Sequence, residues 1–197
     1  MNKKLFLFIL LCLSVIFCTK IKYPISNQEN LSKKVYIDTK FTSSERRKIE
    51  EALNNWKCST NSYVHYMIVG NLSTKEYEDL YDENTLFIEK TNSYNPIIVE
   101  ENDKKQDHSF NVVGYYQRNL NKKDYILIVD DLIGNDELFF GVVLHELGHS
   151  YGLVHSLDPN AIMYPTLTHN LILTKQDLEN FCDAYKCDAS KMLICNY

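Results

Sequence analysis

The stretch ELFFGVVLHELGHSYG, residues 137–152, constrains the fold of this chain more than any other feature. It is apolar nearly all round the circumference of a helix, so a helix here is stable only when it is buried on all sides. Gly134, Asn135 and Asp136 precede it and offer a helix cap. The rest of the chain must therefore supply layers of secondary structure that pack around this helix.

Two further helices are predicted from caps that are followed by apolar residues at helical spacing. Thr42 and Glu45 form a capping-box pattern at the start of a helix over about residues 43–57. Thr174 and Asp177 form the same pattern at the start of a last helix. The residues expected on the inner sides are Ile49, Leu53 and Trp56 in the first helix, and Leu178, Phe181, Cys182 and Tyr185 in the second.

Short apolar runs with strand-like patterns predict a β-sheet. The predicted strands cover residues 33–41, 63–70, 84–92, 95–102, 109–117 and 124–132. The last of them contains an unbroken apolar run, YILIV, which is typical of a strand in the middle of a sheet. Between residues 71 and 109, the remainder is predicted to be a charged loop. We therefore expect an α+β (mixed α/β) domain over residues 33–197, with its chemistry near the buried helix.

Three histidines lie at spacings that suit a metal ion. His145 and His149 are four residues apart on the predicted helix, so their rings project from one face, one turn apart. Two imidazoles at this separation can share one zinc ion. Gly152 can take a left-handed backbone that ends the helix, and the resulting turn can bring back His155 as a third ligand. Three protein ligands leave a fourth position for water, which is typical of a catalytic zinc.

Glu146 lies next to the first histidine but about a quarter-turn round the helix, so it need not bind the metal. Zinc lowers the pKa of a bound water to about 7 and polarises a carbonyl oxygen. A carboxylate at this position can take the proton of that water and pass it to the leaving amine. The pattern therefore predicts Glu146 as the general base of a zinc enzyme that hydrolyses peptide bonds.

Two other interpretations of the histidines stay open. One is a binding or decoy protein that keeps the metal site but does not catalyse a reaction. Such a protein would be expected to have another residue at position 146, and Glu146 is intact. The other is an exported zinc-binding interaction protein, in which zinc only stabilises the fold. A structural zinc site of that kind requires four protein ligands and no open position. His169 is the candidate for such a fourth ligand, because no cysteine lies within the motif.

The full spacing H-E-x-x-H-x-x-G-x-x-H, residues 145–155, resembles the zinc signature of the metzincin metalloproteases. Ser156 after the third histidine, Met163 at the Met-turn and Pro165 beyond it are similar to the matrixins, the matrix-metalloprotease family. The resemblance implies a twisted, mostly parallel sheet with an antiparallel edge strand, an active-site helix and a C-terminal helix. It also implies one catalytic zinc above the apolar floor of Met163. The implied substrate is a protein or peptide that adds as a strand to the edge strand at 109–117.

The chain departs from the matrixin pattern in ways that bear on its metals. The family's second, structural zinc uses several histidines and an aspartate, and only His108 lies in the matching region. Calcium sites are common in the family, and the acidic stretches 100–107 and 130–131 are candidates for calcium here. The paired aspartates that open the family's last helix correspond to Gln176 and Asp177, so one of the two is kept.

The N-terminal residues predict export. Residues 1–18 have a basic start and an apolar run that is too short for a comfortable membrane span, as in a signal peptide, although a short membrane anchor is an alternative. Residues 19–32 are polar and are expected to form a linker. Cys18 ends the apolar run and is a candidate for lipid modification, although Phe17 stands where a small residue is usual. We expect a protein that is secreted or lipid-anchored at the cell surface.

Composition limits the partners and the redox state. The net charge is -5 and both signs are mixed along the chain, so nucleic acid is not an expected partner. We expect a monomer whose membrane attachment, where present, depends on lipidated Cys18. An even number of remaining cysteines fits two disulfides, with three pairings open and free buried thiols as the alternative. These cysteines are Cys58, Cys182, Cys187 and Cys195.

Overall fold

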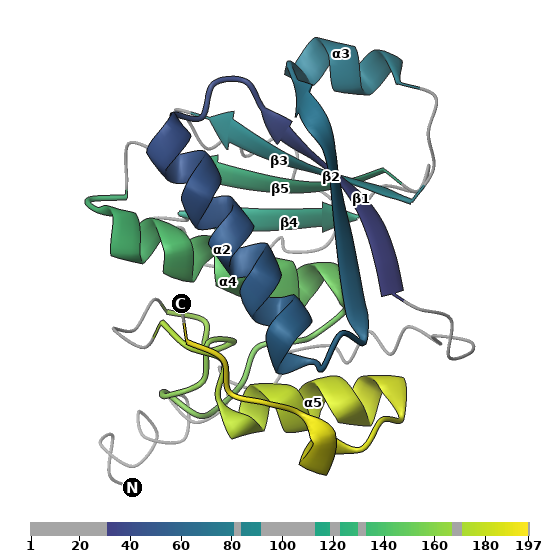
Figure 1. Cartoon of the computed structure of the whole chain (residues 1–197). Coiled ribbons are helices and arrows are strands. Elements are labelled where there is room, and N and C mark those ends of the chain that lie inside the picture. Colours follow the sequence, from purple (N-terminus) through teal and green to yellow (C-terminus); the bar gives the residue numbers. More distant parts are fainter. Residues whose placement is uncertain are drawn as a thin grey trace, which may run out of the picture.

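A five-stranded sheet runs through the middle of the molecule, with strand order β2–β1–β3–β5–β4 (Figure 1). In this computed structural model, only the pair of β4 with β5 is antiparallel, and the other neighbouring strands are parallel. The expected mixed fold, with a mostly parallel sheet and an antiparallel edge strand, is therefore confirmed. The strands are β1 (Leu31–Asp38), β2 (Val64–Leu72), β3 (Thr85–Thr91), β4 (Gly114–Arg118) and β5 (Lys123–Val129).

The structure describes residues 31–80, 84–91, 113–118, 123–129, 133–166 and 171–196. Several sequence expectations lie outside these ranges. They are the export signal, Cys18 and most of the linker, the strand at 95–102, the candidate calcium segments 100–107 and 130–131, and the histidines His108 and His169.

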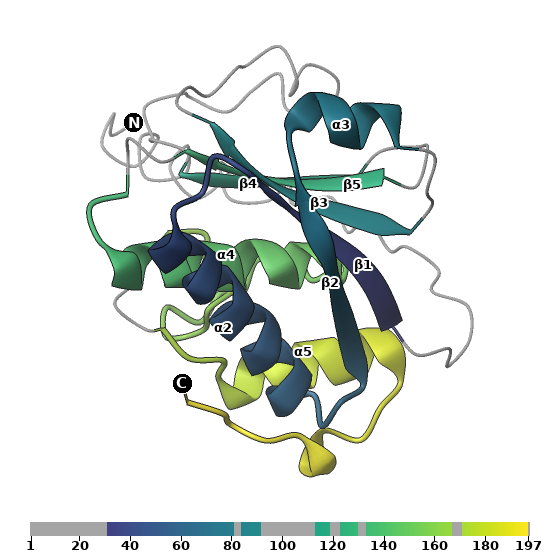
Figure 2. The same ribbon diagram turned by 45° about the horizontal axis from the view of Figure 1, so that its top comes forward.

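Three helices pack on one side of the sheet, namely α2 (Ser43–Ser59), α4 (Asp136–Ser150) and α5 (Lys175–Tyr185). Helices α2 and α4 cover one face of the sheet, and α5 lies below them (Figures 1 and 2). The three N-caps are Thr42, Asn135 and Thr174, so the predicted caps are confirmed. Within the described ranges, none of the helices has both the length and the apolar character needed to cross a bilayer.

The hydrophobic core lies between the sheet and these helices. Trp56 of α2 is fully buried, and its Nε1 donates to the carbonyl of Leu144 in α4 at 2.9 Å. Its ring centroid lies 5.6 Å from that of Tyr151 and 6.1 Å from that of Phe181, so one side chain connects α2, α4 and α5. Helix α4 is buried along most of its length, as its composition predicts. Other predicted inner residues that are buried are Ile49, Leu53, Leu178 and Cys182.

A short helix, α3 (Thr74–Asp79), lies on the opposite face of the sheet (Figure 2). Its fully buried Tyr77 stacks on Phe87 with ring centroids 4.6 Å apart, and its hydroxyl hydrogen-bonds that of Thr85 at 2.7 Å. The charged loop predicted for this segment is therefore wrong. Ser73 and Glu76 form a capping box that marks the helix in the sequence, but one buried side chain gives no apolar periodicity.

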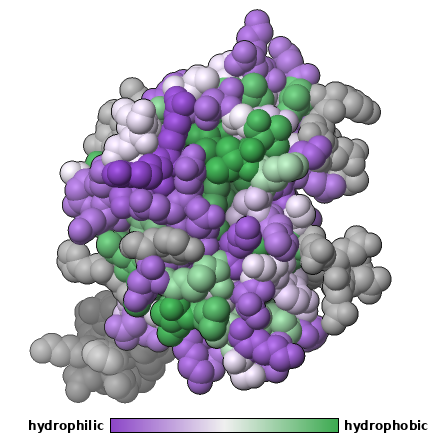
Figure 3. Space-filling model, viewed as in Figure 1, coloured by the Kyte–Doolittle hydropathy of each residue, from purple (hydrophilic) through white to green (hydrophobic). Residues whose placement is uncertain are grey.

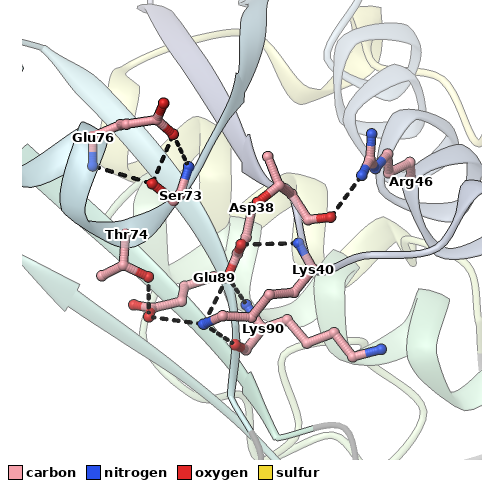
Figure 4. Close-up of polar contacts among 9 residues, drawn as sticks. Asp38, Lys40, Arg46, Ser73, Thr74, Glu76, Glu89 and Lys90 are labelled. Atoms are coloured by element: carbon pink, nitrogen blue, oxygen red, sulfur yellow. Dashed lines mark hydrogen bonds and ion pairs between the residues drawn. The ribbon is translucent and has the colours of Figure 1, made fainter.

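A buried carboxylate ends β1 (Figure 4). Asp38 is fully buried and accepts from the backbone amide of Lys40 at 3.0 Å and from that of Lys90, in β3, at 3.2 Å. The ammonium of Lys40 lies 3.3 Å from the same carboxylate and donates to the carbonyl of Lys90 at 3.2 Å. These contacts turn the chain away from the strand ladder, so β1 ends at Asp38 rather than at residue 41.

The outer edge of β2 is apolar and irregular. Met67, Ile68 and Val69 are 53%, 43% and 45% exposed, and Figure 3 shows an apolar patch over this strand among polar surroundings. Ile68 and Gly70 pair with consecutive residues of β1, so Val69 is an extra residue. This two-against-one arrangement is a β-bulge, which kinks the strand and interrupts its ladder.

Two disulfides close the C-terminal part of the fold. Cys58 pairs with Cys195 and ties the last described residues to the end of α2. Cys182 pairs with Cys187 and closes a short loop after α5. Asn55 donates to the carbonyl of Cys195 at 2.8 Å, which holds the same tail along α2. Two disulfides were expected, and the fold selects this one of the three pairings.

Candidate metal centre and active site

Helix α4 brings the first two histidines together. His145 and His149 lie one helical turn apart, and their Nε2 atoms are 3.1 Å from each other. Nδ1 of His145 lies 2.7 Å from the carbonyl of Ile162, and Nδ1 of His149 lies 2.8 Å from the carbonyl of Leu153. A carbonyl can only accept, so each Nδ1 carries the proton and each Nε2 presents a lone pair.

A tight turn after α4 adds the third histidine. Gly152 has a φ of +77°, in the left-handed region that favours glycine, and its amide donates to the carbonyl of His149 at 2.8 Å. The chain then folds back, and Nε2 of His155 lies 3.2 Å from Nε2 of His149. The ligand atoms of the three histidines all lie within 4.8 Å of one another. The turn predicted from Gly152 is present.

The histidine cluster fits a zinc ion. Burial lowers the pKa of His145 from 6.5 to about 4, and burial together with the neighbouring His145 lowers the pKa of His149 to about 3. Both rings are therefore neutral at physiological pH, which is the state a metal ligand needs. Two Nε2 lone pairs that face each other at 3.1 Å are favourable only around a cation. A nitrogen-only cluster of this kind suits zinc better than calcium or magnesium, which prefer oxygen ligands.

Glu146 is buried beside this cluster. It is 6% exposed, and its Oε2 has no hydrogen-bond partner in the described part of the chain. Burial raises the pKa of Glu146 from 4.5 to about 8, and a hydrogen bond from the backbone of Tyr116 in β4 lowers it in part. In the metal-free chain this carboxyl group is therefore mostly protonated at neutral pH, and a cation held by the neighbouring histidines would favour its ionised, proton-accepting form.

The loop after His155 forms a closed support under the cluster. Met163 is fully buried, and its side chain packs so closely on Gly148 of α4 that a Cβ there would collide with the methionine sulfur. Ser156 is buried and donates its amide to the carbonyl of Met163 at 2.7 Å, which closes the loop. Pro165, which follows the turn, is exposed. The fully buried Met163 thus agrees with an apolar floor.

Asp177 was predicted as a helix cap, but the sequence did not reveal its link to this loop. The residue is fully buried and accepts from the amides of Ile162 at 3.0 Å and Met163 at 3.1 Å, in addition to its capping bonds at Thr174. The carbonyl of Ile162 is the group that orients His145. Asp177 therefore connects α5 to the orientation of the first histidine, and nothing in the local pattern around residue 177 identifies that role.

A comparison with protein-family models settles the relationship. The model described as matrixin matches residues 19–186. The chain belongs to the matrixin family. The family expected from the signature is therefore confirmed.

Individual relatives of this matrixin match over short segments. Matrilysin from Felis catus is 43% identical over 51 residues, which are 24% of this chain and 20% of that protein. Human matrilysin is 43% identical over 51 residues, covering 24% of this chain and 19% of that protein. Mouse interstitial collagenase A is 43% identical over 54 residues, covering 26% and 11%. The match thus spans about a fifth or less of each relative.

The fold of the matrixin is similar to that of a solved metzincin. The crystal structure of archaemetzincin from Methanopyrus kandleri superposes with a TM-score of 0.55. The match covers 83% of this chain and 100% of that one. At 13% sequence identity this similarity concerns the fold alone, and it agrees with the metzincin-like architecture expected from the sequence.

Proposed function

We propose that this matrixin is an exported zinc-dependent endopeptidase that hydrolyses peptide bonds within proteins. The observation that carries the proposal is the convergence of three imidazole nitrogens beside a buried carboxylate, one oxygen of which lacks a partner among the residues that the structure describes. His145, His149 and His155 are proposed as the zinc ligands. Glu146 is proposed as the general base.

Each residue of the site has a separate task in the proposed reaction. Zinc, when bound, supplies a Lewis acid that polarises the carbonyl of the cut bond and lowers the pKa of water. The three neutral imidazoles would hold the ion, and the carbonyls of Ile162 and Leu153 fix the ring orientations of two of them. Glu146 takes a proton from the attacking water and delivers it to the amine, which leaves only after protonation.

The substrate is proposed to lie extended along β4, an edge strand of the sheet. The carbonyl of Val113 accepts from the amide of Val129 at 3.0 Å, so the backbone groups of Val113 and Tyr115 face β5. Those of Gly114 and Tyr116 face the outer edge. The Tyr116 amide there donates to Glu146, so an extended peptide can pair as an added strand through both groups of Gly114 and the carbonyl of Tyr116. The exposed Pro165 is proposed to line the pocket for the residue after the cut bond.

Export is part of the proposal. Disulfides form and persist in oxidising compartments, and the described part of this chain contains two. The basic start and apolar run of residues 1–18 support the same location. The protein is proposed to act as a monomer, either secreted or held at the cell surface by a lipid on Cys18.

The test is digestion of casein or gelatin by the purified full-length protein. Glu146→Ala and Glu137→Ala form a matched pair, because both glutamates lie in α4 and Glu137 is exposed near its start. The wild type and Glu137→Ala should cleave, Glu146→Ala should not, and a zinc chelator should stop cleavage. Bound zinc without cleavage in the wild type would favour the zinc-binding interaction protein. Absence of bound zinc would refute the assignment of the three histidine ligands.

A further inference from the structure

We infer that strand β4 positions the general base as well as binding the substrate, and that Gly114 is a positioning residue for Glu146. The inference rests on the proposed function, in which Glu146 moves the proton. It assigns a requirement to a strand position that the zinc signature does not include.

The first observation is the space at Gly114. A Cβ atom on this residue would lie 2.6 Å from Cγ1 of Val142, 2.8 Å from Oε1 of Glu146 and 3.0 Å from its Cγ. Carbon atoms that are not bonded pack at about 3.5–4.0 Å, so a methyl group here overlaps both side chains. The φ of Gly114 is not positive, so the position needs glycine for clearance and not for backbone conformation.

The second observation is the direction of the backbone groups of β4. In an antiparallel pair, the backbone N–H and C=O groups of every second residue face the partner strand. Because the Val113 carbonyl accepts from the amide of Val129 in β5, the backbone groups of Gly114 and Tyr116 face the outer edge. The Tyr116 backbone hydrogen-bonds the Glu146 carboxylate there. The carboxylate of α4 is therefore held by the edge strand itself, at the residue pair where a substrate strand would also bind.

The histidines are oriented by a different segment from the one that hydrogen-bonds Glu146. His145 and His149 are oriented by the carbonyls of Ile162 and Leu153, which belong to the loop after α4. Oε2 of Glu146 has no partner among the described residues. The base and the histidines thus have separate supports, and a change at Gly114 should move the base while the metal ligands stay in place.

The arrangement also places substrate and base on one support. A peptide paired with the outer edge of β4 takes its position from the backbone groups of Gly114 and from the carbonyl of Tyr116, because the Tyr116 amide already donates to Glu146. Glu146 thus takes its position from the same two residues as the peptide. A catalytic group displaced by about 1 Å can lose about 100-fold in rate. A methyl group at Gly114 points at α4 and not at the outer edge, so we expect it to displace the base and lower turnover while the backbone groups that bind the peptide stay in place.

The test compares Gly114→Ala with Gly70→Ala in the zinc-loaded full-length protein. Gly70 is a suitable control, because it also lies in an edge strand and an added Cβ there meets nothing within 4 Å. Gly114→Ala should lower kcat by about 10- to 100-fold. KM should stay within about two-fold, since the added methyl points at α4, and zinc content should not change. Gly70→Ala should leave all three values at the wild-type level. An unchanged kcat in Gly114→Ala, or a loss of zinc with the loss of activity, would overturn the inference.

A second variant covers the case in which Gly114→Ala fails to fold. Adding Val142→Ala removes the overlap with Cγ1 of Val142 and leaves the overlap with Glu146. The double variant should fold and bind zinc while kcat stays about 10-fold or more below that of Val142→Ala alone. Full recovery of kcat would mean that the glycine serves only helix packing, and the inference would be wrong.

A stability measurement separates this inference from the proposed activity. The drop in melting temperature caused by Gly114→Ala should be smaller in a Glu146→Ala background, because the overlapping carboxylate is then absent. This result is expected even if no substrate is ever cleaved. Equal drops in both backgrounds would show that Gly114 and Glu146 are not coupled and would overturn the inference alone.

Discussion

The buried Glu146 should make the stability of the metal-free protein depend on pH, and Glu146→Gln tests this. Burial raises the pKa of this carboxyl group in the folded chain from 4.5 to about 8. The folded chain therefore holds the proton more tightly than the unfolded chain does. The stability contributed by this group is fully present below pH 4.5 and is lost as the pH rises toward 8.

The size of the effect follows from the width of that window. One pKa unit corresponds to about 1.4 kcal/mol. Between pH 5 and pH 7.5 this group alone should lower the free energy of unfolding by about 3 kcal/mol. His145 and His149 have lowered pKa values and act in the opposite direction, adding stability as the pH rises toward 6.5. The wild type and Glu146→Gln share these histidines, so the difference between the two proteins isolates the glutamate.

Urea unfolding of both proteins, with a chelator present and the disulfides intact, measures this difference. Glu146→Gln should gain about 3 kcal/mol on the wild type between pH 5 and pH 7.5. Saturating zinc should remove most of the pH dependence, because a nearby cation favours the ionised carboxylate. A difference between the two proteins that stays constant with pH would refute the argument from burial.

Three further predictions concern the supports of the site. Asp177→Ala should lower the unfolding free energy by about 2 kcal/mol or more and weaken zinc binding, because two buried amides lose their acceptor. Asp183→Ala, at an exposed position of the same helix, should change neither quantity. Chemical denaturation measures the first effect and zinc titration the second. Gly152→Ala should destabilise by about 1 kcal/mol, since its φ is +77°, and a thermal melt that matches the wild type would contradict this. Replacing Cys58 and Cys195 by serine should lower the free energy of unfolding by about 2–5 kcal/mol. In denaturant titrations, adding a reductant should destabilise this variant less than the wild type, because the variant has already lost the disulfide.

The helix that carries the first two histidines was predictable because its signals are local. Its apolar composition forces burial, and the four-residue spacing of His145 and His149 alone places two rings on one face. The capping boxes of α2 and α5 are equally local, since each needs two residues three positions apart. Helix α3 has a capping box of the same kind, Ser73 and Glu76, but Tyr77 is its only buried residue, so no apolar periodicity accompanies the cap and the helix was not predicted. The end of β1 is set by bonds between Asp38 and a distant strand, which no apolar pattern reports.

Within the site, the sequence predicted the groups that are proposed to bind the metal and move the proton, and it missed the groups that hold them in position. The three histidines and Glu146 lie within eleven consecutive positions of one motif, so their chemistry can be recognised from spacing. Asp177 and Gly114 act on the site across the fold, through bonds to Ile162 and Met163 or through clearance for Glu146. Their roles depend on which segments pack together, and a single sequence carries that information only through the complete fold.

The bulge in β2 bears on whether copies of this protein can pair through that strand. An open sheet edge with three exposed apolar residues in a row is the usual starting point for aggregation between copies. The extra residue Val69 breaks the even spacing of backbone donors and acceptors in the middle of that edge. A strand from another copy can match only a few residues on either side of the break, so we expect that pairing between copies does not spread along this edge. We thus propose that the two edges of the sheet differ. An additional peptide strand can pair with β4, and β2 is unsuited to such pairing.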